Sequence, residues 1–267
     1  MTSLKQPLPR LVFTNTVRTW FVIAFIGQLI FAVYIILLYG GAAITQDLDR
    51  WNAAAPHAME EGSTMGNLGF AVHVLMAAII TILGPLQLIP DVRAKAPRFH
   101  RISGRVYIGA AFLTSIVGLL LVWLKGTVGG TVGHIFVSLN AIIIMTCAWF
   151  AITTARRRQF ALHRQWAIRL FLAMSGVWMF RIFLMMWLML HGAPVGFDPE
   201  TFTGPFLTCL YVSVYVLPIA IAEWYLRTST SKQTAQQWGF SLFLAILTIG
   251  MSIGIFAATM GMWLPRI

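Results

Sequence analysis

Four of the six histidines fall in four consecutive apolar stretches, where an ionisable side chain is costly and therefore a functional candidate. His73 and His134 lie in the outer half of their stretches, whereas His100 and His163 stand at the inner start of theirs. Two imidazoles at matched depth on neighbouring helices can supply both axial nitrogens of one haem iron. The four histidines therefore predict two haem b groups, one near each membrane face. A structural hydrogen bond or a lipid headgroup contact is the alternative for each of them.

The histidines are also spaced as a repeat. His73 and His100 are 27 positions apart, and His134 and His163 are 29 apart. Each second histidine opens a similar phrase, in which an arginine follows at once and another arginine comes four or five positions later. This pattern predicts a duplicated two-helix unit, about 68–124 and 133–190, that frames a central site.

Arg181 lies 18 positions after His163, hence on the same helical face and about 27 Å further along the helix. An arginine at that depth needs an anionic partner, such as a haem propionate or a lipid or quinone headgroup, or else helix carbonyls. The candidate cofactor-binding residues are His73, His100, His134, His163, Arg101, Arg105, Arg164, Arg169 and Arg181, of which the four histidines are the candidate iron ligands.

These residues must be positioned by membrane helices. Apolar residues make up 58% of the 267 positions and charged residues only 10%, against about 25% charged in soluble domains, which argues against an ordinary soluble enzyme. Stretches long enough to cross about 30 Å of hydrocarbon predict an all-α, polytopic bundle of seven transmembrane helices in one domain. The stretches are 20–39, 68–90, 102–124, 133–153, 167–190, 205–225 and 240–263. The first is too long for the apolar part of a signal peptide, so we interpret it as a retained helix.

The net charge of +11 follows the predicted topology. Of the 19 lysines and arginines, fifteen fall on one side of the predicted bundle, three on the other and Arg181 within a stretch. The positive-inside rule then predicts a cytoplasmic N-terminus, an outer C-terminus and a multi-pass protein of the bacterial inner membrane. Because the charge is distributed by side of the membrane, it predicts no nucleic-acid partner.

Few other groups suggest chemistry. Cys147 and Cys209 lie in apolar stretches without a paired spacing, so neither a disulfide framework nor a zinc cluster is expected. His57, Glu60 and Glu61 cluster in the long outer loop, where they either bind a metal or form an ordinary solvated segment, the latter being favoured.

The helix order of the four histidines resembles the cytochrome b561 type of diheme protein. In that type, histidines on the second and fourth helices hold one haem and histidines on the third and fifth hold the other. The resemblance implies electron transfer through haem b.

A more specific resemblance rests on three phrases: Gly84-Pro85-Leu86-Gln87, the run from His100 to Tyr107, and the run from His163 to Arg169 with Arg181 beyond it. In order, residue types and spacing they are similar to the bacterial membrane family catalogued as domain of unknown function 2306, over roughly 68–190. The resemblance implies a membrane protein whose pattern includes Gln87, and it implies no activity.

Three functions are consistent with these observations. The first is a diheme electron carrier that exchanges electrons with quinol and redox partner proteins, alone or in an oligomer or larger complex. The second is a non-haem transporter or scaffold subunit whose inner His-Arg clusters bind an anionic headgroup or small molecule. A metal-dependent enzyme ranks last, because the inner side offers only Asp91 and Glu223 as carboxylates.

Overall fold

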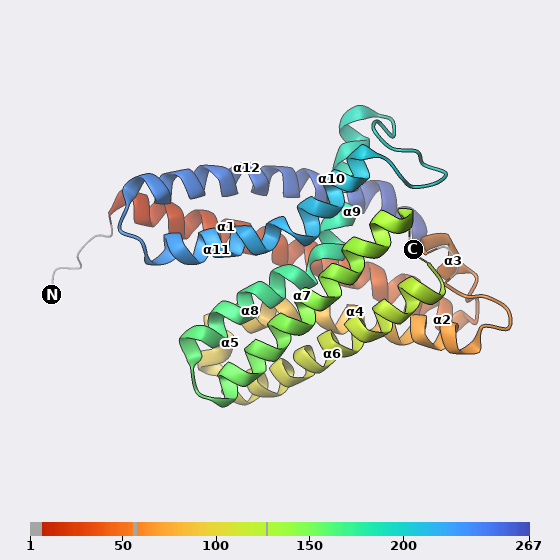
Figure 1. Ribbon diagram of the computed structural model, residues 1–267, viewed down its shortest axis with the longest axis horizontal. Helices are drawn as coiled ribbons and strands as arrows, with labels where there is room; N and C mark the ends of the chain where they lie inside the picture. Colours follow the sequence, from red (N-terminus) through yellow and green to blue (C-terminus); the bar gives the residue numbers. More distant parts are fainter. Residues whose placement is uncertain (1–6, 56–57, 127) are drawn as a thin grey trace.

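The computed structural model describes residues 7–55, 58–126 and 128–267 (Figure 1). Within these residues the chain consists of helices and their connections, apart from one isolated bridge between Asp198 and Thr203. The predicted all-α fold class is therefore confirmed.

The predicted number of spans agrees with the described helices. Six helical segments are long and apolar enough to cross a membrane, and a seventh is obtained if α8 (Phe160–Met174) and α9 (Gly176–His191), bent by 47°, are one span. The six segments are Leu8–Thr45, Thr64–Leu88, Pro97–Leu124, Gly130–Arg156, Pro205–Thr230 and Thr234–Arg266.

Prolines start several of the helices, because a proline in the first turn removes an N–H that would have no helical partner. Pro90, Pro97 and Pro205 are the first residues of their helices. The remaining elements are α1 (Leu8–Ile35), the π-helical η1 (Ile36–Gly40), α2 (Gly41–Thr45), α3 (Arg50–Ala54), α4 (Thr64–Leu88), α5 (Pro90–Lys95), α6 (Pro97–Leu124), α7 (Gly130–Arg156), α10 (Pro205–Tyr215), α11 (Leu217–Thr230), α12 (Thr234–Ala258), the π-helical η2 (Thr259–Trp263) and the 3₁₀ turn η3 (Leu264–Arg266).

The long helices form two groups. In the first group α6 packs between α4 and α7, and α8 packs on α7; in the second, α12 packs against both α1 and α9 (Figure 1). Two half-length helices connect the groups, since α10 contacts α7 and α9 while α11 contacts α8 and α12. The predicted repeat units coincide with the helix hairpins that begin with α4 and with α7, and their duplication stays a prediction.

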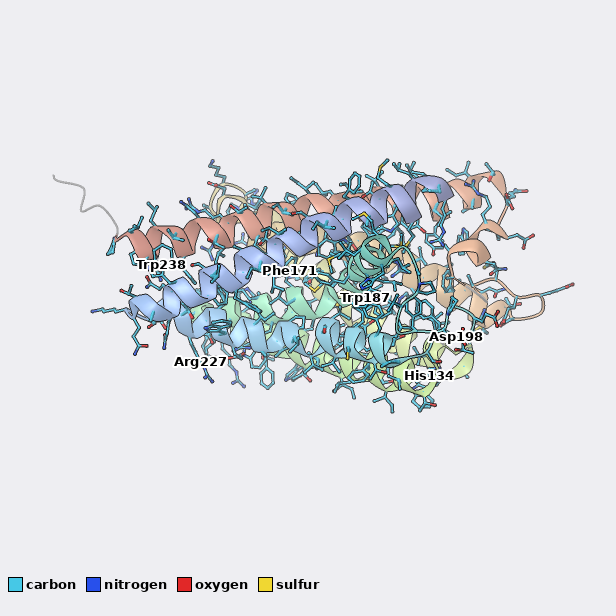
Figure 2. All side chains as sticks on the ribbon, turned by 90° about the horizontal axis from the view of Figure 1, so that it is seen from above. His134, Phe171, Trp187, Asp198, Arg227 and Trp238 are labelled. Carbon is cyan, nitrogen blue, oxygen red and sulfur yellow. The ribbon has the colours of Figure 1, made fainter. Side chains whose placement is uncertain are left out.

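The two ends of the bundle differ in charge. We call the end at which α1, α6, α8 and α12 begin the basic end, and the other the opposite end. Figure 2 shows Arg227 and Trp238 at the basic end, Asp198 and His134 near the opposite end, and Phe171 and Trp187 between them. The orientation of these ends across a membrane stays a prediction. The basic end carries Arg10, Arg93, Arg98, Arg101, Arg156, Arg157, Arg158, Arg164 and Arg227.

Two spans are interrupted at mid-depth, and the interruptions touch. Between α8 and α9, Ser175 Oγ donates to the Phe171 carbonyl at 2.8 Å and Gly176 follows, a serine-glycine pair of the kind that bends helices. Between α10 and α11, Pro218 stands in the first turn of α11. A Cβ on Gly176 would come within 2.6 Å of a ring carbon of Tyr215, so glycine is required for this close approach.

Candidate binding cavity

A cavity of about 2440 Å³ begins at the basic end and extends between the two helix groups. Residues of α1 and of every long helix from α4 to α12 line it. Most of its wall is apolar, and it includes Phe171 and Trp187, which Figure 2 shows between the two ends of the bundle. An apolar cavity with polar groups at one end suits a ligand that has one polar end and one apolar end.

Arginines concentrate at the basic end of this cavity. Seven arginines line it, and Asp91 is the only acidic residue among the described residues that do so. Asp91 in turn pairs with Lys95 at 3.3 Å, which reduces its effect on the arginines. The cavity mouth is therefore positively charged and favours an anion. The lining arginines, hereafter the basic rim, are Arg10, Arg18, Arg93, Arg101, Arg105, Arg156 and Arg164.

Two members of the basic rim hold α11 in place. Arg10 Nη1 donates to the Ser229 carbonyl at 2.8 Å, and Arg164 Nη2 donates to the Tyr225 hydroxyl at 3.0 Å. Arg101 forms no ion pair with a carboxylate of the described residues, and the same holds for Arg105. Their guanidinium groups are available for an anionic ligand, which they can bind through two parallel N–H donors each.

His100 and His163 line the same cavity beside these arginines. His163 Nδ1 lies 2.9 Å from the Ala151 carbonyl, which can only accept, so Nδ1 carries the proton and Nε2 keeps the lone pair in the neutral ring. His100 Nδ1 is buried without a hydrogen-bond partner, and His100 lies within electrostatic range of His163 and Arg101. The structure thus brings the predicted inner pair to one site, together with Arg101, Arg105 and Arg164.

The predicted outer pair is placed differently. His73 packs against α6, where its Cε1 lies 3.1 Å from the position of a Cβ on Gly118. His134 packs against the Trp123 ring of α6, with ring centroids 5.5 Å apart. Gly118 and Trp123 lie about 140° apart around α6, which separates α4 from α7. The two imidazoles thus contact residues on different sides of α6, and their pairing around one iron stays a prediction.

The other two predicted arginines lie outside the cavity wall. Arg169 Nε donates to Glu223 Oε1 at 2.6 Å, and its guanidinium lies 4.6 Å from the Trp166 ring centroid. Arg181 donates to the carbonyl of Val177 on its own helix at 3.3 Å and lies 5.5 Å from the Phe31 ring. Among the described residues no carboxylate lies within 4.0 Å of Arg181, and the Val177 carbonyl is the acceptor that its guanidinium contacts there.

Gln87 lies at the cavity wall and joins two helices, because its Nε2 donates to Ser103 Oγ at 2.8 Å. The loop cluster is only partly described: Glu60 Oε2 pairs with Lys125 Nζ at 3.4 Å, and His57 lies outside the described residues. Among the described residues no group of three or more His, Cys, Asp or Glu could hold a metal ion.

The polar layer around the α8–α9 bend was not foreseen from the sequence. Gln28 of α1 donates to Ser175 Oγ at 2.8 Å, and Asn140 of α7 donates to the Ala173 carbonyl at 3.3 Å. Two side-chain amides, those of Gln28 and Asn140, thus join α1 and α7 to the region of the bend. The adjacent Ser175 and Gly176 are the local signal that could have indicated a bend.

Comparison with known proteins identifies the family. A model of the family described as "Predicted membrane protein (DUF2306)" matches residues 70–208, more than half of the chain. The protein belongs to this family. The match confirms the resemblance drawn from the phrases around Gln87, His100 and His163. Neither the curated proteins nor the solved structures contain a significant match to this DUF2306 protein.

Proposed function

We propose that this DUF2306 protein binds an anionic amphiphile in the cavity between its two helix groups, as a carrier or as the lipid-binding subunit of a larger assembly. The proposal places the protein in the bacterial inner membrane, with the basic end facing the cytoplasm as the positive-inside rule predicts. The headgroup would enter from the cytoplasmic leaflet.

The observation that carries the proposal is the combination of a basic rim with an apolar interior in one cavity. Arg101 and Arg105 have no carboxylate to neutralise them within the described residues, and His100 keeps a buried ring nitrogen without a partner. A phosphate or phosphate ester provides the acceptors that the two guanidinium groups lack, and arginine recognises it in a bidentate manner.

Binding to detergent-purified protein tests the proposal. The probe is geranylgeranyl monophosphate, and geranylgeraniol is its uncharged counterpart. We expect the phosphate to bind the wild-type protein and Arg101→Gln with Arg105→Gln to weaken binding by about tenfold or more, since hydrogen bonds to charged groups contribute about 1.5–3 kcal/mol each. Arg98→Gln is the matched control, because Arg98 lies on the same helix one turn before Arg101, is exposed and is not part of the cavity wall.

Two outcomes would contradict the proposal. One is equal affinity of the wild-type protein for the phosphate and the alcohol, because then the basic rim plays no part. The other is an equal loss in the Arg98→Gln control, because then any positive charge at this end suffices.

A second candidate retains part of the haem hypothesis: one haem b held by His100 and His163, with quinol as the electron donor. It is favoured by the shared cavity of these two histidines and by the free Nε2 lone pair of His163. A reduced-minus-oxidised spectrum of the purified protein tests it. A b-type α band that disappears in His163→Ala and persists in His134→Ala supports one haem at the basic end, and a spectrum without such a band eliminates it.

A further inference from the structure

The cavity extends along an entire span. Residues of α10 and α11 line it at intervals of one to four positions, from the first residue of α10 to the last of α11. These 26 residues correspond to about 37 Å of helix, which exceeds the hydrocarbon thickness of about 30 Å. Cys209 and Ser213 of α10 are among the lining residues.

The wall beyond mid-depth is apolar on its other sides as well. On α9 the cavity is lined by Met179, Phe183, Met186 and Trp187, which share one helical face. All seven lining arginines belong to α1, α5, α6, α7 and α8, and none to α9 or α10. The cavity therefore has one anion-binding end and a long apolar arm that continues past the two mid-depth interruptions.

This length limits the class of ligand. Half of the hydrocarbon core is about 15 Å, so the acyl chains of an ordinary phospholipid with its headgroup at the basic rim end near the membrane centre. The part of the apolar arm beyond mid-depth, hereafter the outer arm, would then remain unfilled by that lipid. A single apolar chain longer than one leaflet fills both parts, and each buried methylene adds to the binding free energy.

Resting on the proposed function, we infer that the anionic amphiphile is a polyprenyl phosphate, with its phosphate at the basic rim and its chain extending past mid-depth to α9 and α10. The phosphate contacts Arg101 and Arg105, and the distal part of the chain lies against Cys209.

Cys209 provides a direct test, because it lines the outer arm as an exposed free thiol while Cys147 is buried. Its alkylation by N-ethylmaleimide is measured in Cys147→Ala protein with prenyl monophosphates of increasing chain length, namely geranyl, geranylgeranyl and undecaprenyl. Each is used at saturation, established by displacement of the geranylgeranyl probe. We expect undecaprenyl phosphate to slow alkylation by about tenfold and geranyl phosphate to leave the rate unchanged, since only the longer chain covers the thiol.

A variant that narrows the cavity gives an independent measurement. Ser213→Trp places a large side chain in the arm at mid-depth, whereas Thr208→Trp places it on the same helix at an exposed position outside the cavity wall. We expect Ser213→Trp to weaken the binding of undecaprenyl phosphate by about tenfold and to leave geranyl phosphate unaffected. Thr208→Trp should affect neither ligand.

The outcomes separate the inference from the proposed function. If geranyl and undecaprenyl phosphate bind but protect Cys209 equally, or not at all, the chain-length inference is wrong and the anion-binding proposal stands. Equal protection by dioleoyl phosphatidic acid would assign the cavity to ordinary phospholipid and also overturn the inference. If no prenyl phosphate displaces the probe or binds at all, the proposed function itself fails.

Discussion

The two ends of the bundle differ in how tightly their side chains pack. At the opposite end, Trp263 is 1% exposed and packs against Phe31 and Tyr34, with ring centroids 5.3 and 6.0 Å apart. At the basic end, Trp238 of the same chain segment is 44% exposed, and the cavity separates the helix groups. The difference indicates that aromatic packing between α1 and η2 closes the opposite end, while the basic end leaves room for a ligand.

The largest expected effect on stability comes from removing the aromatic packing at the opposite end. Trp263→Ala removes a fully buried indole, so we expect a loss of about 3 kcal/mol in the free energy of unfolding through lost packing and a new cavity. Trp238→Ala is the matched control, and we expect a change within about 0.5 kcal/mol. Thermal unfolding in detergent measures both. A larger loss for Trp238→Ala would reverse the comparison.

Two ion pairs allow a second comparison between regions of the molecule. Arg169 and Glu223 join α8 to α11 at 2.6 Å, whereas Lys125, the residue after α6, pairs with Glu60 of a loop at 3.4 Å. We expect Glu223→Gln to cost about 1–2 kcal/mol, because the arginine side chain, 13% exposed, then has no charged partner.

Glu60→Gln should cost less, since Lys125 Nζ keeps its hydrogen bond to Asn67 at 3.0 Å. Chemical unfolding in mixed micelles measures both variants. The interpretation fails if Glu60→Gln proves the more destabilising of the two.

The smallest expected effect concerns pH at the opposite end. Hydrogen bonds from the Glu200 amide and from the Thr201 hydroxyl hold the pKa of Asp198 below its ordinary value. A carboxyl whose pKa is lowered by folding stabilises the folded loop above its unfolded pKa of about 3.9, and the contribution is lost as the pH falls through the folded value.

We therefore expect hydrogen exchange at the Glu200 amide to accelerate below about pH 4 relative to neighbouring amides. Asp198→Asn should remove this pH dependence and leave the basic end unaffected. An unchanged pH profile in the variant would show that another group controls the loop.

The sequence predicted the spans well, because their apolar length follows directly from the hydrocarbon thickness. It also predicted the convergence of His100, His163, Arg101, Arg105 and Arg164, since these residues start two helices from the same end. Depth along a helix can be read from residue spacing alone.

The direction in which a side chain points around its helix could not be predicted in the same way. The sequence predicted His73 and His134 at matched depth, yet they contact residues of α6 that are five positions apart in sequence and about 140° apart around the helix. The partner residues Glu223 and Gln28 were missed for a different reason. They lie 54 and 147 positions from Arg169 and Ser175, so no local sequence pattern indicates these contacts. The π-helical turns η1 and η2 likewise have no simple sequence signature.

A density map of the protein purified with its native lipids tests the central claim most directly. The account predicts an elongated density between the two helix groups, with a phosphate-sized head beside Arg101 and Arg105 and a tail that passes the α8–α9 bend. Helix groups that close on each other without an occupant, or a flat macrocycle between His100 and His163, would contradict it.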